Sequence, residues 1–255
     1  MIIAFCFYKL KLKNNLINEK NKEIEEKEKM IQLHNYNGEI QLYHEFNDDT
    51  NSNRDVNYTY AIIYPGLYRI CVYGSKAEVG GKGGKQCAEH PFEKGSNIKF
   101  YYEGQNSGGK GGECSGYFGF FGGKGYNGGG LSKAEFGNKF LIVAGGGGGD
   151  SQNKINKGGD SEKDGSGLKG GRKGFKKGKS QNKGKNGGSI GKFGLYCGGG
   201  GGNGYDGGNG GDYGNKKEVG GGGGGSNYCK AKNCFPSETN FYNYSGFEIF
   251  KKIIL

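Results

Sequence analysis

The segment Asn138–Gly149 reads NKFLIVAGGGGG, an apolar run that passes without a break into five consecutive glycines. Its apolar part, Leu141–Val143, is strand-like and needs burial, so the glycines that follow must enter the fold with it. Similar glycine runs recur at Gly198–Gly202 and Gly220–Gly225. The segment therefore predicts a β-core that is joined directly to an ordered array of glycine tracts.

The composition limits how large a conventional core can be. Of the 255 residues, 58 are Gly and only 3 are Pro, which excludes collagen because collagen needs a strict Gly-X-Y repeat with abundant Pro. Apolar residues make up 32%, below the roughly 45–50% of an ordinary globular domain. Aromatic residues are plentiful, with 18 Tyr and 16 Phe, whereas disordered chains contain few. We expect a modest aromatic-rich β-core with a large glycine-rich elaboration.

Alternating or continuous apolar runs separated by turn signals predict six strands with no amphipathic helix between them. The predicted strands cover residues 39–45, 60–64, 67–73, 98–102, 139–144 and 247–255. This spacing favours a mainly β fold with an antiparallel sandwich or jelly-roll-like core.

The N-terminal part of the chain has a different character. Leu16–Leu33 is rich in strong helix formers and predicts a short, solvated helix. We therefore divide the chain into a polar, helical or low-order segment at residues 1–35 and a glycine-rich domain at residues 36–255. Within this domain, residues 151–192 are rich in Lys, Gly and Asn and predict a flexible loop.

Ordered glycine runs need a compensating interaction, because Gly loses more backbone entropy on folding than any other residue. Extended threefold helices of the polyglycine-II type would supply it, since they pack closely and bond N–H to C=O between neighbours. The structural glycines predicted for such packing are Gly74, Gly83, Gly145, Gly147, Gly149, Gly198, Gly200, Gly202, Gly220, Gly223 and Gly225.

Cysteine usage favours an oxidising compartment, because a chain with little core gains much from covalent loop closure. Apart from Cys6, six cysteines lie in the glycine-rich domain, enough for three disulfides whose pairing the sequence leaves open: Cys71, Cys87, Cys114, Cys197, Cys229 and Cys234. Asn57-Tyr58-Thr59 and Asn243-Tyr244-Ser245 have the form of N-glycosylation acceptors.

Targeting signals do not settle the location. Met1–Tyr8 is apolar but too short for the apolar region of a signal peptide, and basic residues follow it rather than precede it. No apolar stretch reaches the ~18 residues of a membrane span. We expect an extracellular or cell-surface protein whose natural N terminus is missing or mis-assigned; a cytosolic protein is the alternative. The net charge of +11 suits anionic partners such as acidic glycans, or it reflects a Lys- and Asn-rich bias without a partner.

Catalytic and cofactor motifs are not found. A kinase needs an HRD-type loop and a DFG-type metal site, and neither occurs. Gly178-Lys179-Ser180 lacks the first glycine of a phosphate loop, because Lys173 stands there. Cys87 with His90, and Cys229 with Cys234, lack the paired C-x-x-C spacing of zinc sites, and no RGG segment suggests specific nucleic-acid binding. We predict no catalytic, metal or cofactor residues and no cofactor.

Several sequence blocks occur in a characteristic order: Pro65–Tyr68, Val72–Gly74, Gly80–Gly84, Leu141–Gly149, Gly222–Tyr228 and Ser245–Ile249. This order resembles the glycine-rich domain of the anaplastic lymphoma kinase and leukocyte tyrosine kinase receptor ectodomains, and of related protist surface proteins. The resemblance covers residues 58–255, with Tyr73 in place of a family tryptophan. It implies an extracellular module in which polyglycine helices pack against β-structure and which binds a polypeptide ligand.

The function expected from these features is a non-catalytic extracellular domain that recognises a protein or an anionic glycan at the cell surface. A structural coat or matrix protein is one alternative. Another is an ectodomain fragment of a receptor tyrosine kinase whose kinase part lies outside this sequence.

Overall fold

The computed structural model describes residues 32–36, 39–45, 56–62, 64–114, 123–138, 140–154, 156–167, 170–174, 183–189, 196–242 and 246–251. Most of the predicted helix over Leu16–Leu33 lies outside these residues. Its last two residues belong to strand β1 (Gln32–Tyr36), which pairs with β2 (Glu39–Glu45). The β1–β2 hairpin therefore crosses the boundary predicted at residue 35.

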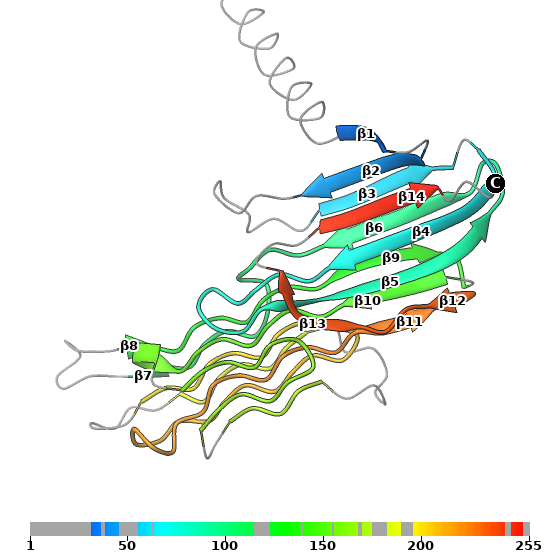
Figure 1. Cartoon of the computed structure of the whole chain (residues 1–255). Coiled ribbons are helices and arrows are strands. Elements are labelled where there is room, and N and C mark those ends of the chain that lie inside the picture. Colours follow the sequence, from blue (N-terminus) through cyan, green and yellow to red (C-terminus); the bar gives the residue numbers. More distant parts are fainter. Residues whose placement is uncertain are drawn as a thin grey trace, which may run out of the picture.

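The first sheet has seven strands and is antiparallel throughout (Figure 1). Its order is β1-β2-β14-β4-β5-β12, and β13 also pairs with β5. The further strands are β4 (Gly66–Tyr73), β5 (Gly83–Phe92), β12 (Asn233–Cys234), β13 (Glu238–Tyr242) and β14 (Gly246–Lys251). The last strand, β14, therefore lies between two strands from the first third of the chain.

The second sheet has five strands in the order β11-β10-β9-β6-β3, again all antiparallel. They are β3 (Val56–Ala61), β6 (Asn97–Tyr102), β9 (Ser132–Phe136), β10 (Phe140–Ala144) and β11 (Tyr228–Lys230). Two short strands, β7 (Glu113–Cys114) and β8 (Gly123–Lys124), pair separately, and residues Gln152–Lys154 form a single 3₁₀ turn.

The predicted mainly β, antiparallel class is confirmed, and most predicted strands occur within a few residues of their expected bounds. The strand predicted at 60–64 is shifted, because β3 ends at Ala61. Eight described strands are additional to the six predicted ones: β1, β5, β7, β8, β9, β11, β12 and β13. The sequence of β5, GGKQCAEHPF, contains the glycine and proline that usually end strands, yet β5 pairs with β4 over eight registered positions.

One hydrophobic cluster joins the two sheets. Phe247 of the first sheet stacks on Phe100 of the second, with ring centroids 4.0 Å apart. Ile70 and Ile142, which also come from opposite sheets, are fully buried in the same cluster. Inward and outward residues alternate along β6, as a half-buried strand requires. The two sheets therefore bury a shared core.

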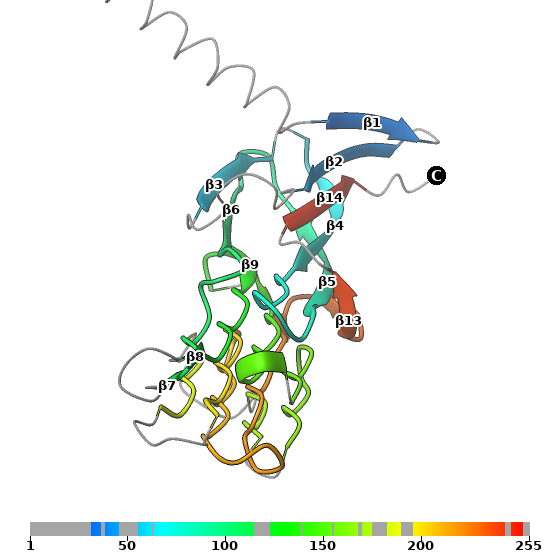
Figure 2. The same cartoon turned by 90° about the vertical axis from the view of Figure 1, so that its left-hand side faces the viewer.

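The glycine tracts leave the sheets at one end and lie together beyond them (Figures 1 and 2). The central tract, Gly145–Gly149, continues directly from β10. The amide of Gly146 donates to the Asn203 carbonyl and that of Gly149 to the Gly200 carbonyl, both at 2.7 Å. Residues three positions apart thus meet the same neighbouring tract.

The two residues between Gly146 and Gly149 form hydrogen bonds to other segments of the chain. Gly147 N donates to Ser75 O at 3.1 Å, and Gly148 N donates to Gly159 O at 2.8 Å. Gly129 N in turn donates to Gly147 O at 2.7 Å. A strand in a sheet bonds within one plane, whereas this tract bonds in several directions. The tracts therefore form a three-dimensional hydrogen-bonded array.

Close approach explains why glycine occupies the array. A Cβ on Gly147 would overlap the carbonyl oxygen of Gly81, and a Cβ on Gly149 would overlap that of Tyr126. Among the eleven predicted structural glycines, ten would place a Cβ against a backbone carbonyl oxygen in this way: Gly74, Gly83, Gly145, Gly147, Gly149, Gly198, Gly200, Gly202, Gly223 and Gly225. Gly220 instead accepts a hydrogen bond from Gly199 N at 3.0 Å.

The described parts of the 151–192 segment differ from the flexible loop that the composition predicted. Gly159 N donates to Gly222 O at 2.8 Å, Gly171 N to Gly221 O at 2.9 Å, and Gly187 N to Lys110 O at 2.8 Å. The segment has few apolar residues, but the array is held by backbone hydrogen bonds, which need none. These parts of the segment therefore belong to the array.

Candidate functional site

The six candidate cysteines all form disulfides. Cys71 of β4 and Cys87 of β5 lie opposite each other in the register and are joined. Cys229 and Cys234 join β11 of the second sheet to β12 of the first, and Cys114–Cys197 lies in the array. Cys71–Cys87 therefore crosslinks two strands of the first sheet, Cys229–Cys234 crosslinks the two sheets, and Cys114–Cys197 crosslinks the array.

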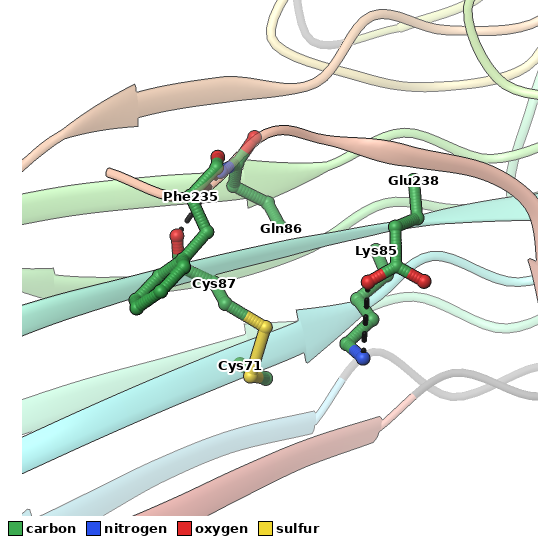
Figure 3. The surroundings of a disulfide bond; sticks show 6 residues. All are labelled: Cys71, Lys85, Gln86, Cys87, Phe235 and Glu238. Atoms are coloured by element: carbon green, nitrogen blue, oxygen red, sulfur yellow. Dashed lines mark hydrogen bonds and ion pairs between the residues drawn. A yellow bond between two sulfur atoms is a disulfide. The ribbon is translucent and has the colours of Figure 1, made fainter.

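Phe235 covers the Cys71–Cys87 disulfide on the outer face of the first sheet (Figure 3). Its ring lies 4.2 Å from the guanidinium carbon of Arg69, and its carbonyl accepts a hydrogen bond from Gln86 Nε2 at 2.8 Å. Nearby, Lys85 Nζ lies 3.3 Å from a carboxylate oxygen of Glu238. These contacts hold the segment before β13 against the sheet, so this cluster has a structural role.

A buried carboxylate connects the core to the array. Glu103, directly after β6, accepts from the Tyr101 hydroxyl at 3.0 Å and from the Leu131 amide at 3.1 Å. Asn203 Nδ2 also donates to this carboxylate, while Asn203 Oδ1 accepts from Gly184 N at 2.7 Å. These donors come from β6, from the residue before β9 and from a glycine tract, so the carboxylate links the second sheet to the array.

A second buried carboxylate ends the central glycine tract. Asp150 is fully buried, lies 2.9 Å from Lys157 Nζ, and accepts from Gly158 N at 2.8 Å. Sequence reasoning missed Asp150, Glu103 and Asn203 as structural residues. A signal was present for Asp150, because an acidic residue directly after a glycine run can accept the hydrogen bonds of nearby amides.

A shallow concavity lies on the outer face of the second sheet, with a volume of about 350 Å³. Within it, Lys133 Nζ lies 3.3 Å from Glu135 and 5.4 Å from the centroid of the Tyr101 ring. Strands β3, β6 and β9 supply the lining, which comprises Asn57, Tyr58, Thr59, Lys99, Phe100, Tyr101, Lys133 and Glu135. Its mixture of hydroxyl, amide, aromatic and charged groups could contact a polar ligand such as a sugar.

Exposed basic side chains stand on neighbouring tracts of the array. Lys110, Lys183 and Lys185 are all exposed, and none forms an ion pair with a described residue. The tract of Lys110 is bonded to that of Lys185, because Lys110 N donates to Asn186 Oδ1 at 2.9 Å and Lys110 O accepts from Gly187 N. The array therefore presents lysine ammonium groups on tracts whose backbones are hydrogen-bonded to each other.

The two predicted glycosylation acceptors differ in what the structure describes. Asn57 is an exposed residue of β3, and Asn243 lies outside the described residues. In the described part of the chain, no group of three or more His, Cys, Asp or Glu side chains is arranged to hold a metal ion. The same residues include no helix long and apolar enough to cross a membrane.

Comparison with protein-family models gives no match, and comparison with curated proteins gives none either.

Proposed function

We propose that this chain is a non-catalytic extracellular domain that binds a protein or an anionic glycan at the cell surface. Three disulfides and the absence of a membrane-spanning helix among the described residues are compatible with an extracellular location. The resemblance to receptor glycine-rich domains supports the same interpretation.

The architecture that we propose for this role is an antiparallel sandwich extended by polyglycine-II helices. Two observations support it: the core shared by the sheets, and the three-residue period of the hydrogen bonds between tracts. Polyglycine-II helices repeat every three residues and bond laterally to several neighbours. Such an array would hold ligand-binding side chains rigidly without a large apolar core, which lowers the entropy lost on binding.

The observation that carries the proposal is the set of exposed lysines on bonded tracts of the array. A lysine on a flexible loop loses backbone and side-chain entropy when it binds, whereas these lysines stand on an already fixed backbone. With a net charge of +11, an anionic surface is the favoured partner.

The test is binding of the secreted, disulfide-bonded chain to cells and to heparin as a sulfated-glycan probe. Charge reversal on the array should abolish binding, and the same number of reversals in and beside the sheets should leave it unchanged. The array variant is Lys110→Glu, Lys183→Glu and Lys185→Glu; the matched control, also at exposed positions, is Lys94→Glu, Lys230→Glu and Lys232→Glu. Binding should also weaken as salt rises, because exposed charges are screened.

Equal binding by both variants would contradict the proposed surface. Concentration-dependent self-association without cell or heparin binding would instead support the structural coat or matrix protein. Sedimentation of the purified chain over a range of concentrations separates these outcomes.

A further inference from the structure

Asn57 and Thr59 stand together on the outer face of the second sheet. Between them, Tyr58 points into the core, where its ring centroid lies 5.9 Å from that of Phe247. Since side chains alternate along a strand, Asn57 and Thr59 both face outward, and both are exposed. The folded chain thus presents the two functional residues of an Asn-X-Thr acceptor on one surface.

Nothing described in the structure occupies this acceptor. The Asn57 side chain forms no hydrogen bond within the described residues, and among these residues β3 pairs only with β6, on one side. A group attached to the Asn57 amide nitrogen would therefore displace no core contact. It would project over the sheet beside an unpaired strand edge.

The concavity described above begins at Asn57. Asn57 is registered against Tyr101 of β6, and Tyr101 against Lys133 of β9, so the three side chains form one row across the sheet. The volume of about 350 Å³ lies at the lower end of the roughly 300–1,000 Å³ typical of small-ligand sites. A ring such as Tyr101 with polar neighbours offers an apolar face and hydrogen-bonding groups, which a pyranose can use together.

We propose that Asn57 carries an N-linked glycan whose first sugars lie in this concavity against Tyr101. The donor is a lipid-pyrophosphate-linked oligosaccharide. The Asn57 amide nitrogen forms a bond to C1 of the N-acetylhexosamine that is joined to the pyrophosphate, the C1–oxygen bond to the pyrophosphate breaks, and the lipid pyrophosphate leaves. The amide nitrogen loses one proton to a base of the transferase.

The attached glycan has one consequence for the molecule. It covers part of the outer face of the second sheet over β3 and β6, so that surface is closed to a ligand while the exposed lysines of the array stay open. This inference rests on the extracellular location in the proposed function but not on any particular ligand.

The test uses the full chain secreted from a eukaryotic cell with an added leader, and glycopeptide mass spectrometry of residue 57. We expect glycan at Asn57 in the unaltered chain and in Thr59→Ser, which keeps the acceptor, but none in Thr59→Ala, which removes it. Asn243→Gln should leave the occupancy at Asn57 unchanged. An unmodified Asn57 in the secreted, disulfide-bonded chain would overturn the proposal.

Placement of the glycan is tested separately by lysine acetylation before and after enzymatic release of the glycan. Release should raise the reactivity of Lys99 several-fold and leave that of Lys82, which is exposed in the array, unchanged. Unchanged reactivity of Lys99 would overturn the placement in the concavity. A chain that carries the glycan but binds neither cells nor heparin would overturn the proposed function and leave the glycan site standing.

Discussion

Asn203 and Glu103, which are 100 residues apart in the chain, are both buried and are joined by a hydrogen bond from the amide to the carboxylate. The bond ties a glycine tract to the residue that follows β6. A charged acceptor in the interior is stable only when donors surround it, and here the Tyr101 hydroxyl and the Leu131 amide also donate to the carboxylate. The core and the array are therefore coupled.

Glu103→Gln should lower the free energy of unfolding by about 1–3 kcal/mol, because it replaces a charged acceptor of three donors by a neutral one. Urea denaturation measures the change. The control is Glu93→Gln at an exposed position, for which we expect less than about 0.5 kcal/mol. Unchanged or increased stability of Glu103→Gln would mean that the desolvation cost of the buried charge equals or exceeds the stabilisation from its hydrogen bonds.

Gly147→Ala should destabilise the chain by about 3 kcal/mol or more, because its Cβ would overlap the Gly81 carbonyl and force two tracts apart. The matched control is Gly95→Ala. Gly95 has φ +84°, and no atom lies within 4 Å of the place that its Cβ would take, so only the backbone strain of about 1–2 kcal/mol applies. The denaturation midpoints of the two variants measure the loss of stability. Equal losses would show that the close approach of the tracts does not require glycine at position 147.

Backbone amides of the central tract should exchange slowly with deuterium. Gly146, Gly148 and Gly149 each donate to a carbonyl at 2.7 or 2.8 Å and are buried, so exchange requires opening of the array. Mass spectrometry or NMR exchange rates measure this, with the exposed Gly137 turn as the internal reference. Rates in the tract as fast as those of Gly137 would contradict the proposed polyglycine-II packing.

Removal of the Cys114–Cys197 disulfide by a double Ser substitution should cost more stability than removal of Cys229–Cys234. The sequence separations are 83 and 5 residues, and loop-closure entropy predicts roughly 4–5 and 2 kcal/mol respectively. Denaturation of the two double variants under non-reducing conditions tests the order. The reverse order would show that the disulfides act mainly on the folded state.

Alkaline pH should destabilise the chain through Tyr102. Burial raises the pKa of the Tyr102 phenol above its ordinary value, so the folded state retains a proton that the unfolded chain releases. Unfolding is therefore favoured as pH rises above about 10, the usual tyrosine pKa, and the stability is fully present below it. Tyr102→Phe should make the stability curve flatter above this pH. An identical slope in both proteins would exclude Tyr102 as the cause.

Local sequence patterns were sufficient for some elements and not for others. The alternation of Ile98, Phe100 and Tyr102 specified β6, because side chains on one face of a strand must share one environment. Strand β5 gave no such signal, since its glycines and Pro91 look like a loop, and its partner β4 decides its conformation. The described parts of the 151–192 segment differ from the predicted loop for a related reason: their backbone amides bond to distant carbonyls, which the composition of the segment does not reveal.

The sequence by itself determined the β class, the direct joining of β10 to a glycine tract, and the six cysteines available for disulfides. These properties depend on residue type and local order along the chain. Only the tertiary structure decided which cysteines pair, which tracts are neighbours, and that Glu103, Asn203 and Asp150 accept or donate inside the array. Backbone hydrogen bonds between glycines carry no side-chain identity, so a sequence of glycines cannot specify which partner each one meets.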